Sequence, residues 1–255
     1  MKRSVLLQSV QSAEIRAVRT AGLLDDLAIA SADMEQIPSF RAQLESGEMM
    51  PVGSVEFVSE AMSVAGIEPP QPPGFPASLQ SWLHRTVART SVGKLASLTA
   101  RTFVKPVATK VFNGFVFDPA DDAALDEHDR EQLALLRRLD PATEVWTSPV
   151  VSFTSEWRYY VCGGRVIGEA RYDPDGADDA PAPERAQVDA AIAAYGALAP
   201  YSLDMGVLAS GETALVEIHD AWALGLYAHA LTPRVYYRML RDWWDFHLAQ
   251  QVQPV

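Results

Sequence analysis

Short apolar runs alternate with helix-length segments over the first quarter of the chain. The run Val5-Leu6-Leu7 predicts a buried strand, and residues 14–24 have the spacing of a helix. The same alternation predicts further strands over 27–30 and 50–52. It also predicts helices over 40–45, capped by Ser39, and over 54–65, capped by Ser54. Strands that alternate with helices are typical of a small parallel sheet.

A proline-rich segment ends this pattern. Between Ile67 and Pro76 the chain reads EPPQPPGFP. Each proline removes a backbone donor and restricts the residue before it, so this segment cannot hold a regular ladder. We therefore predict a small α/β domain over 1–67, a linker over 68–78 and a larger unit over 79–255.

The larger unit contains apolar runs of the length and composition of strands. Residues 79–98 have an imperfect helical spacing and predict a helix, and glycines 163 and 164 predict a tight hairpin because glycine supplies positive φ. Further helices are predicted over 133–139, 187–198 and 233–249. The predicted strands are 103–105, 115–117, 145–147, 150–153, 158–162, 165–170, 202–209 and 214–219. The expected fold class is α+β, rich in antiparallel strands.

Composition narrows the possible partners. The chain has 255 residues, 48% of them hydrophobic, which is enough for one large or two small domains with a core. A formal net charge of -12 argues against nucleic-acid or anionic membrane partners. Cys162 is the single cysteine, so no internal disulfide can form and a reducing compartment is expected. The apolar run behind Met1-Lys2-Arg3 is too short for a signal peptide or a membrane span, which favours a cytoplasmic protein.

Charged residues stand in otherwise apolar strands in three clusters, over 103–114, 155–161 and 203–220. A charge in such a strand is costly unless it is partnered or functional. The cationic candidates, which could bind a triphosphate, are Lys105, Lys110 and Arg158. The acidic candidates, which could hold a divalent metal, are Asp204 and Glu217. Glu156 stands two positions before Arg158, near the cationic candidates. These strands therefore predict a phosphate and metal site.

Each residue taken singly also has a structural explanation. Lys105 could be an edge-strand lysine that extends its ammonium to solvent. Glu156 and Arg158 share a strand face and could be a surface ion pair of little value. His219 could be a hydrogen-bonded structural histidine. The joint order of all these residues favours the functional interpretation.

In this order and at these separations, the three clusters resemble the ATP-grasp superfamily, and closely a small bacterial branch of it. The resemblance runs from about Phe103 to the C-terminal helix. It implies an ATP-grasp fold, in which 79–255 forms a lid and an antiparallel ATP-binding body behind a pre-ATP-grasp-like domain. Lys105 matches the strand lysine that binds nucleotide phosphates, and Lys110 lies near Asn113-Gly114 in a loop that resembles the lid over ATP. Glu156 and Arg158, followed by the glycine hairpin, match the family's Glu-x-Arg strand.

The metal positions of the family match with one departure. Asp204 and Glu217 fit, but His219 stands where an asparagine is usual, and Asp220 follows it. Magnesium prefers oxygen ligands, so an imidazole is a poor replacement for an amide. Either Asp220 reaches the ion, or His219 favours a softer metal such as manganese, or a second metal site is weakened. Strand alternation places Glu217 and His219 on one face and Asp220 on the other.

The resemblance implies an ADP-forming carboxylate-amine ligase that uses ATP and Mg²⁺, with Mn²⁺ possible. A small-molecule or peptide carboxylate attacks the γ-phosphate, and an amine then attacks the acylphosphate to form an amide or peptide bond. Lys105 and Arg158 are the expected catalytic residues. The base is expected against residues 144–150, where Glu144 and Trp146 offer contacts, and residues 222–227 are the expected substrate contact. The alternatives are a phosphotransferase and a non-catalytic nucleotide- or partner-binding module.

Overall fold

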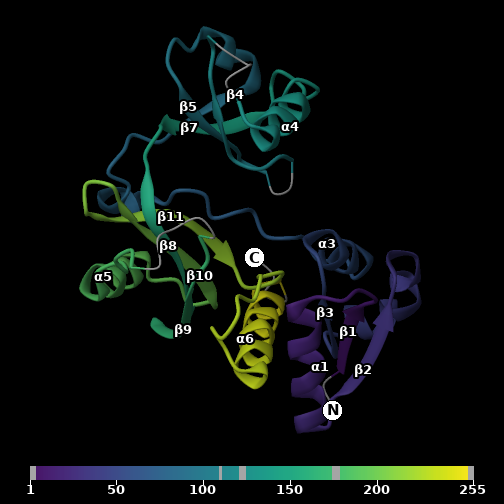
Figure 1. Cartoon of the computed structure of the whole chain (residues 1–255). Coiled ribbons are helices and arrows are strands. Elements are labelled where there is room, and N and C mark those ends of the chain that lie inside the picture. Colours follow the sequence, from purple (N-terminus) through teal and green to yellow (C-terminus); the bar gives the residue numbers. More distant parts are fainter. Residues whose placement is uncertain (1–3, 109–110, 121–124, 174–178, 252–255) are drawn as a thin grey trace.

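The computed structural model describes residues 4–108, 111–120, 125–173 and 179–251. Three sheets organise this part of the chain, one parallel and two antiparallel (Figure 1). The parallel sheet forms the N-terminal domain, the second sheet forms a lid and the third forms a body. This arrangement confirms the expected α+β class with a small α/β domain at the N-terminus.

The N-terminal domain is a three-stranded parallel sheet in the order β2-β1-β3. Its strands are β1 (Ser4–Gln8), β2 (Ala28–Ala32) and β3 (Met49–Val52). Its helices are α1 (Ala13–Asp25), α2 (Arg41–Glu45) and α3 (Val55–Val64), with the 3₁₀ helix η1 (Met34–Phe40) before α2. The predicted strands and helices of this region are therefore confirmed.

Capping explains where these helices begin. The Ser54 hydroxyl accepts a hydrogen bond from the Phe57 amide at 3.3 Å, as predicted. The predicted cap at Ser39 is wrong, because Ser39 lies inside η1 and α2 begins only at Arg41, with no side-chain cap. An earlier start signal explains the difference: the Gln36 side chain accepts from the Asp33 amide at 2.9 Å and begins the helical turn there.

The predicted helix over 79–98 is wrong. The chain instead forms a 3₁₀ helix η2 (Ala77–Trp82), an edge strand β4 (Ala88–Ser91) and a 3₁₀ helix η3 (Val92–Ser97). His84 has a left-handed backbone with φ of 49°, which ends the first helical segment. The Arg85 guanidinium donates to the Leu83 and Leu215 carbonyls, so a contact far along the sequence fixes the chain direction here.

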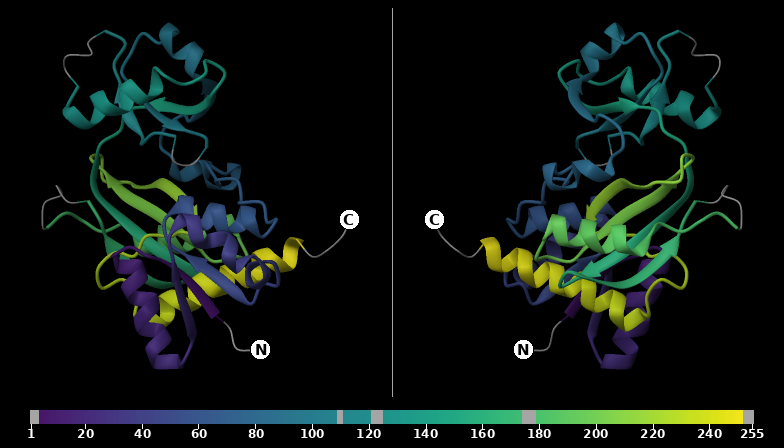
Figure 2. Two further views of the ribbon diagram at one scale, coloured as in Figure 1. Left: turned by 90° about the vertical axis from the view of Figure 1, so that its right-hand side faces the viewer. Right: turned by 90° about the vertical axis from the view of Figure 1, so that its left-hand side faces the viewer.

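The lid is an antiparallel sheet in the order β4-β7-β5-β6 with one helix against it. Its remaining elements are β5 (Thr102–Pro106), β6 (Phe115–Phe117), α4 (Glu127–Leu136) and β7 (Glu144–Pro149). A small core that includes Val104, Phe115 and Leu133 packs between sheet and helix. In both views of Figure 2 the lid lies at one end of the molecule, away from the N-terminal domain.

The body is an antiparallel sheet in the order β11-β10-β8-β9. Its strands are β8 (Phe153–Cys162), β9 (Arg165–Arg171), β10 (Tyr201–Leu208) and β11 (Thr213–Asp220). The predicted hairpin between β8 and β9 is confirmed, with φ of 55° at Gly163 and 71° at Gly164. The predicted strand over 150–153 is wrong except at Phe153, because residues 150–152 connect the lid to the body and are not part of a strand.

Two helices complete the body and join it to the N-terminal domain. They are α5 (Arg185–Tyr195) and α6 (Pro233–Gln251), and α6 packs against α1 (Figure 1). One buried core contains Val5 and Phe57 of the N-terminal domain together with Tyr160 of β8 and Trp244 of α6. In the part of the chain that the structure describes, no helix has the length and apolarity needed to cross a membrane.

Candidate active site in the cleft between lid and body

A cavity of about 690 Å³ lies between the lid and the body. The proline-rich linker and the N-terminal domain also border it, through Phe75 and Val55. Its charged lining residues come from three strands and one connecting segment. They are Lys105 on β5, Glu156 and Arg158 on β8, Glu217, His219 and Asp220 on β11, and Arg85 between η2 and β4. Charged side chains from strands that are far apart in the sequence therefore line one cavity.

Asp204, Glu217 and His219 form a compact cluster on the neighbouring strands β10 and β11. Asp204 of β10 is paired in register with Glu217 of β11, and the ligand atoms of all three residues lie within 4.8 Å of one another. The His219 Nε2 atom is 2.7 Å from Glu217 Oε1 and 3.7 Å from Asp204 Oδ2. Strand alternation explains why Glu217 and His219 share this face.

Asp220 faces away from the cluster. Burial raises the pKa of its carboxyl to about 6, although a hydrogen bond with the Trp243 side chain acts in the opposite direction. The bond to Trp243 directs the carboxylate toward α6. Of the alternatives that the sequence leaves open, the geometry favours His219 over Asp220 as the neighbour of Glu217.

The cluster has the donor set of a divalent cation site. Two carboxylates and one imidazole nitrogen converge, which suits Mg²⁺ through its oxygens and Mn²⁺ through all three groups. Among the described residues, the buried His219 Nε2 atom has no partner in hydrogen-bond geometry, although Glu217 Oε1 is near it. The three groups bring their ligand atoms within 4.8 Å of one another, so the residues fit a metal ion.

Lys105 reaches across the cleft from the lid to this cluster. Its ammonium forms an ion pair with the Glu217 carboxylate, and its Nζ atom lies 5.9 Å from the centre of the Phe75 ring. Burial would raise the pKa of Glu217, but the close contacts with His219 and Lys105 hold that pKa well below its usual value. Glu217 is therefore ionised and ready to bind a cation, and Lys105 is not an edge-strand lysine in solvent.

Arg158 forms a buried bidentate ion pair with Asp204. Its Nε atom lies 2.8 Å from Oδ1 and its Nη2 atom 2.6 Å from Oδ2. Burial would lower the pKa of Arg158, but the hydrogen bonds and charge of Asp204 raise it above the usual value. The guanidinium also lies 5.1 Å from the ring centre of Tyr227 and 5.9 Å from that of Tyr172. Asp204 does not bind the Nη1 atom of Arg158, so this atom can donate to another group.

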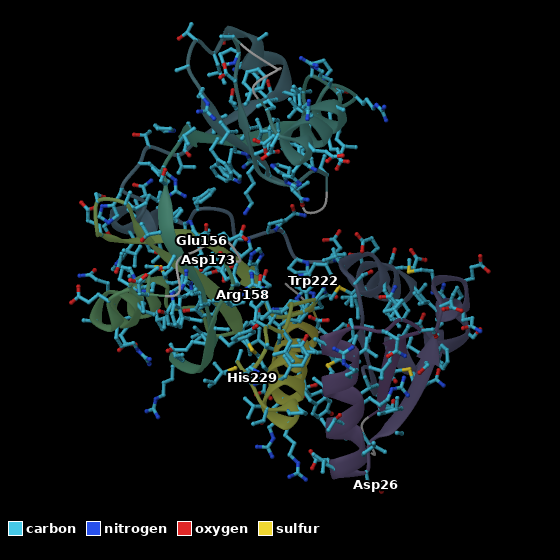
Figure 3. All side chains as sticks on the ribbon, viewed as in Figure 1. Asp26, Glu156, Arg158, Asp173, Trp222 and His229 are labelled. Carbon is cyan, nitrogen blue, oxygen red and sulfur yellow. The ribbon has the colours of Figure 1, made fainter. Side chains whose placement is uncertain are left out.

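Glu156 does not pair with Arg158, so the alternative of a surface ion pair is wrong. Its Oε2 atom accepts a hydrogen bond from the Tyr172 hydroxyl at 2.8 Å, and its amide donates to Asp173 at 2.9 Å. Burial raises the pKa of Glu156, against the effect of the Tyr172 hydrogen bond. Figure 3 shows Glu156 and Arg158 on the body sheet, with Trp222 on the side toward the N-terminal domain.

The residues predicted to contact the base separate into two groups. Trp146 lines the cavity and packs edge-to-face on Phe75, with ring centres 5.4 Å apart. Glu144 does not line it, because it lies at the outer end of β7 and pairs with Arg89 of the neighbouring strand β4. Lys110 lies outside the described residues.

Several cavity residues had no clear signal in the sequence. Arg85 falls within the predicted helix over 79–98, which does not form. Phe75 falls within the linker, which the sequence predicts from its prolines alone. Tyr172 directly follows β9, two positions beyond the end of the predicted strand, and its polar ring could have marked it as a candidate. The predicted substrate contact is supported in part, because residues 222–225 line the cavity.

Comparisons with known proteins show related folds. The D-alanine–D-alanine ligase from Bacillus anthracis complexed with ATP has a TM-score of 0.55 at 12% identity, over 98% of this chain and 99% of that one. The L-amino acid ligase from Bacillus licheniformis has a TM-score of 0.53 at 12% identity, over 100% and 76%. The ATP-grasp ligase PsnB complexed with a minimal precursor has a TM-score of 0.52 at 13% identity, over 94% and 99%. A further structure of PsnB contains Mg and ADP, with a TM-score of 0.50 at 13% identity, over 95% and 98%.

At these identities the likeness is one of fold. No curated protein matches the sequence. A family does match it: residues 82–239, more than half of the chain, fit the ATP-grasp domain described as R2K clade family 2. This match spans β4 to α6 and includes all seven charged cavity residues described above. The chain therefore belongs to the R2K clade of ATP-grasp domain proteins.

Proposed function

We propose that this protein is an ATP-dependent ligase that joins a carboxylate to an amine and releases ADP and phosphate. The observation that carries the proposal is the contact of Lys105 with Glu217, which lines the cavity together with His219 and lies in register with the buried Asp204. A lysine opposite a cation site is what a triphosphate with its metal ion requires. The similar folds of a D-alanine–D-alanine ligase and an L-amino acid ligase support this class of reaction.

The residues take separate roles in this proposal. Lys105, with Lys110, binds phosphate oxygens, and the base lies against β7 at Trp146. Asp204, Glu217 and His219 hold Mg²⁺, or Mn²⁺ in its place, which when bound supplies positive charge to the phosphates. Glu156 borders the substrate side with Trp222, and Arg158 directs Nη1 toward the reacting carboxylate. Residues 1–67 complete the substrate side, 68–78 form the linker, and 79–255 comprise lid and body.

The reaction balances without a protein nucleophile. A carboxylate oxygen of the first substrate bonds to the γ-phosphorus while the bond from that phosphorus to ADP breaks. The nitrogen of the second substrate then bonds to the acyl carbon, phosphate departs with the C–O bond electrons, and the amine loses a proton. Positioning and charge stabilisation by Lys105 and Arg158 are the contributions of the chain to both steps.

The test is a product analysis with purified protein, Mg-ATP and mixtures of amino acids and short peptides. We expect ADP and phosphate in equal amounts, and a new amide by mass spectrometry, only when a carboxylate and an amine are both present. A phosphorylated acceptor that accumulates would show a phosphotransferase. ATP-induced stabilisation against heat with no turnover across the panel would show a binding module.

A further inference from the structure

The segment after β11 borders the cavity and is fixed through its backbone. The Leu224 carbonyl accepts a hydrogen bond from the Tyr236 hydroxyl of α6, and the Gly225 carbonyl accepts one at 2.9 Å from the Tyr160 hydroxyl of β8. The same Tyr160 oxygen accepts from the Tyr227 amide at 3.0 Å. We call residues 222–227 the cavity loop. Three consecutive peptide groups of this loop are thus hydrogen-bonded to side chains from other elements.

Another amide of this loop is bonded to the N-terminal domain. The Leu226 amide donates to Glu14 Oε1 at 2.8 Å, across 212 positions of sequence. Glu14 is the second residue of α1, in the first turn after the Ser12 cap, so its side chain projects from the end of the helix nearest the loop. Glu14 lies outside residues 82–239, which match the family, and no shared sequence pattern assigns it a role.

The cavity loop in turn contacts Arg158. A Cβ atom at Gly225 would lie 3.6 Å from Arg158 Nη1 and 3.9 Å from Glu14 Oε1. The Tyr227 ring lies 5.1 Å from the same guanidinium. Arg158 Nε and Nη2 are fixed by Asp204, so the surroundings of Nη1 depend on where the loop lies. A displacement of Leu226 would move both neighbours of Nη1.

We propose that Glu14 is a positioning residue: its carboxylate fixes the cavity loop and thereby the space in front of Arg158 Nη1. The N-terminal domain then contributes directly to the geometry of the site in the neighbouring body. The hydrogen bond can be tested in the free protein, and its effect on turnover rests on the proposed ligase function.

The test separates reach from charge with three variants of the full chain. Glu14→Gln keeps an acceptor oxygen at the same distance without the charge, and Glu14→Asp keeps the charge but shortens the side chain. Glu60→Gln, on the exposed part of α3, is the control. We expect hydrogen exchange at the Leu226 amide, measured by NMR, to accelerate about tenfold or more in Glu14→Asp, because the loss of one hydrogen bond to a charged acceptor is of that size. Exchange in Glu14→Gln and Glu60→Gln stays within about threefold of the wild type.

Turnover supplies the second measurement. If the ligase reaction occurs, kcat falls about tenfold in Glu14→Asp, while the KM for ATP stays within about twofold, because Lys105 and β7 are untouched. In Glu14→Gln, kcat stays close to that of the wild type, because the acceptor oxygen is kept. Unchanged exchange at Leu226 in Glu14→Asp overturns the proposal, and so does equal acceleration in Glu14→Gln, which would assign the effect to charge at the helix terminus. Absence of turnover in the wild type contradicts the proposed function and leaves the exchange test intact.

Discussion

At the residue scale, Asp204 and Glu217, the two carboxylates of the candidate metal site, each contact a cationic side chain of this protein. Lys105 pairs with Glu217, and Arg158 pairs with Asp204 through two hydrogen bonds. The Arg158 pair is buried, with 9% and 0% of the two side chains exposed, whereas Lys105 and Glu217 are 28% and 26% exposed. Exchange of partners is therefore easier for Lys105, because water can solvate the separated charges. We infer that Lys105 leaves Glu217 for phosphate when nucleotide and metal bind.

This exchange predicts opposite effects of Lys105→Ala on two ligands. Affinity for Mg-ATP falls by about 1–3 kcal/mol, because a charge-assisted contact to phosphate is lost. Affinity for Mn²⁺ alone rises by about threefold to tenfold, because Glu217 loses the cation that competes with the ion. Calorimetry with each ligand measures both changes. Lys94→Ala, on the exposed surface of the lid, is the control, and unchanged ATP affinity in Lys105→Ala would exclude Lys105 from the phosphate site.

Glu217→Gln removes one ligand charge at nearly constant shape. Turnover is expected to fall at least about a hundredfold, because the charge opposite the phosphates is lost, while far-ultraviolet circular dichroism and the melting curve remain those of a folded protein. Steady-state assays at several Mg²⁺ concentrations make the comparison. Turnover within a factor of two of the wild type would place the metal elsewhere.

His219→Asn replaces the imidazole by an amide that offers an oxygen. Because Mg²⁺ prefers oxygen ligands, Mg²⁺-dependent activity is expected to be preserved or to rise, and the ratio of Mn²⁺- to Mg²⁺-supported rates to fall. A severe loss of activity, with ATP and metal still bound by calorimetry, would instead show that the imidazole has its own role, such as proton transfer from the attacking amine.

At the element scale, close backbone approach decides where β9 can lie. A Cβ atom at Gly168 would be 2.2 Å from the Ala230 carbonyl oxygen and 2.4 Å from Leu231 Cδ2. Backbone cannot move aside as a flexible side chain can. The segment that leads into α6 therefore packs against β9 only because residue 168 has no side chain.

Gly168→Ala is expected to lower the free energy of unfolding by about 1–3 kcal/mol, because the added methyl group overpacks a backbone contact. Urea denaturation measures the change. Gly225→Ala is the matched control, since its Cβ would meet Arg158 at 3.6 Å, an ordinary contact, and its stability should stay within about 0.5 kcal/mol of the wild type. Equal stability of the two variants would contradict the close packing of β9.

At the scale of the whole molecule, the proline-rich linker separates the N-terminal domain from the rest of the chain in sequence, but the two parts share one buried core. The largest core cluster combines Val5, Phe57 and Met62 of the N-terminal domain with Tyr236 and Trp244 of α6. Helix α1 packs on α6, and Glu14 and Arg234 add polar contacts across the same boundary. The N-terminal domain and the body therefore stabilise each other.

A fragment over 79–255 is accordingly expected not to fold cooperatively. Removal of the N-terminal domain exposes the apolar face of α6, where each large side chain costs about 1.5–3 kcal/mol when transferred to water. Thermal unfolding and binding of a hydrophobic dye compare the fragment with the full chain, which should melt in one transition. Two transitions in the full chain, one of which matches a folded fragment, would contradict the shared core.

The sequence determined the elements whose signals are local. Alternating apolar segments gave the parallel domain, and Gly163-Gly164 gave the hairpin, because left-handed φ at two adjacent positions favours glycine. Charged residues in apolar strands singled out Lys105, Arg158, Asp204 and Glu217, because a charge there needs a partner. These features depend on neighbours a few positions away or on residue chemistry.

Only the tertiary structure decided the rest. Residues 79–98 do not form the predicted helix, and Arg85 within them donates to the Leu215 carbonyl. Glu144 pairs with Arg89 outside the cavity, and Glu14 accepts from the Leu226 amide. Each outcome depends on two residues that are far apart in sequence and meet only when the sheets are assembled. The local spacing of residues does not predict such long-range contacts, because their free energy depends on the folded geometry itself.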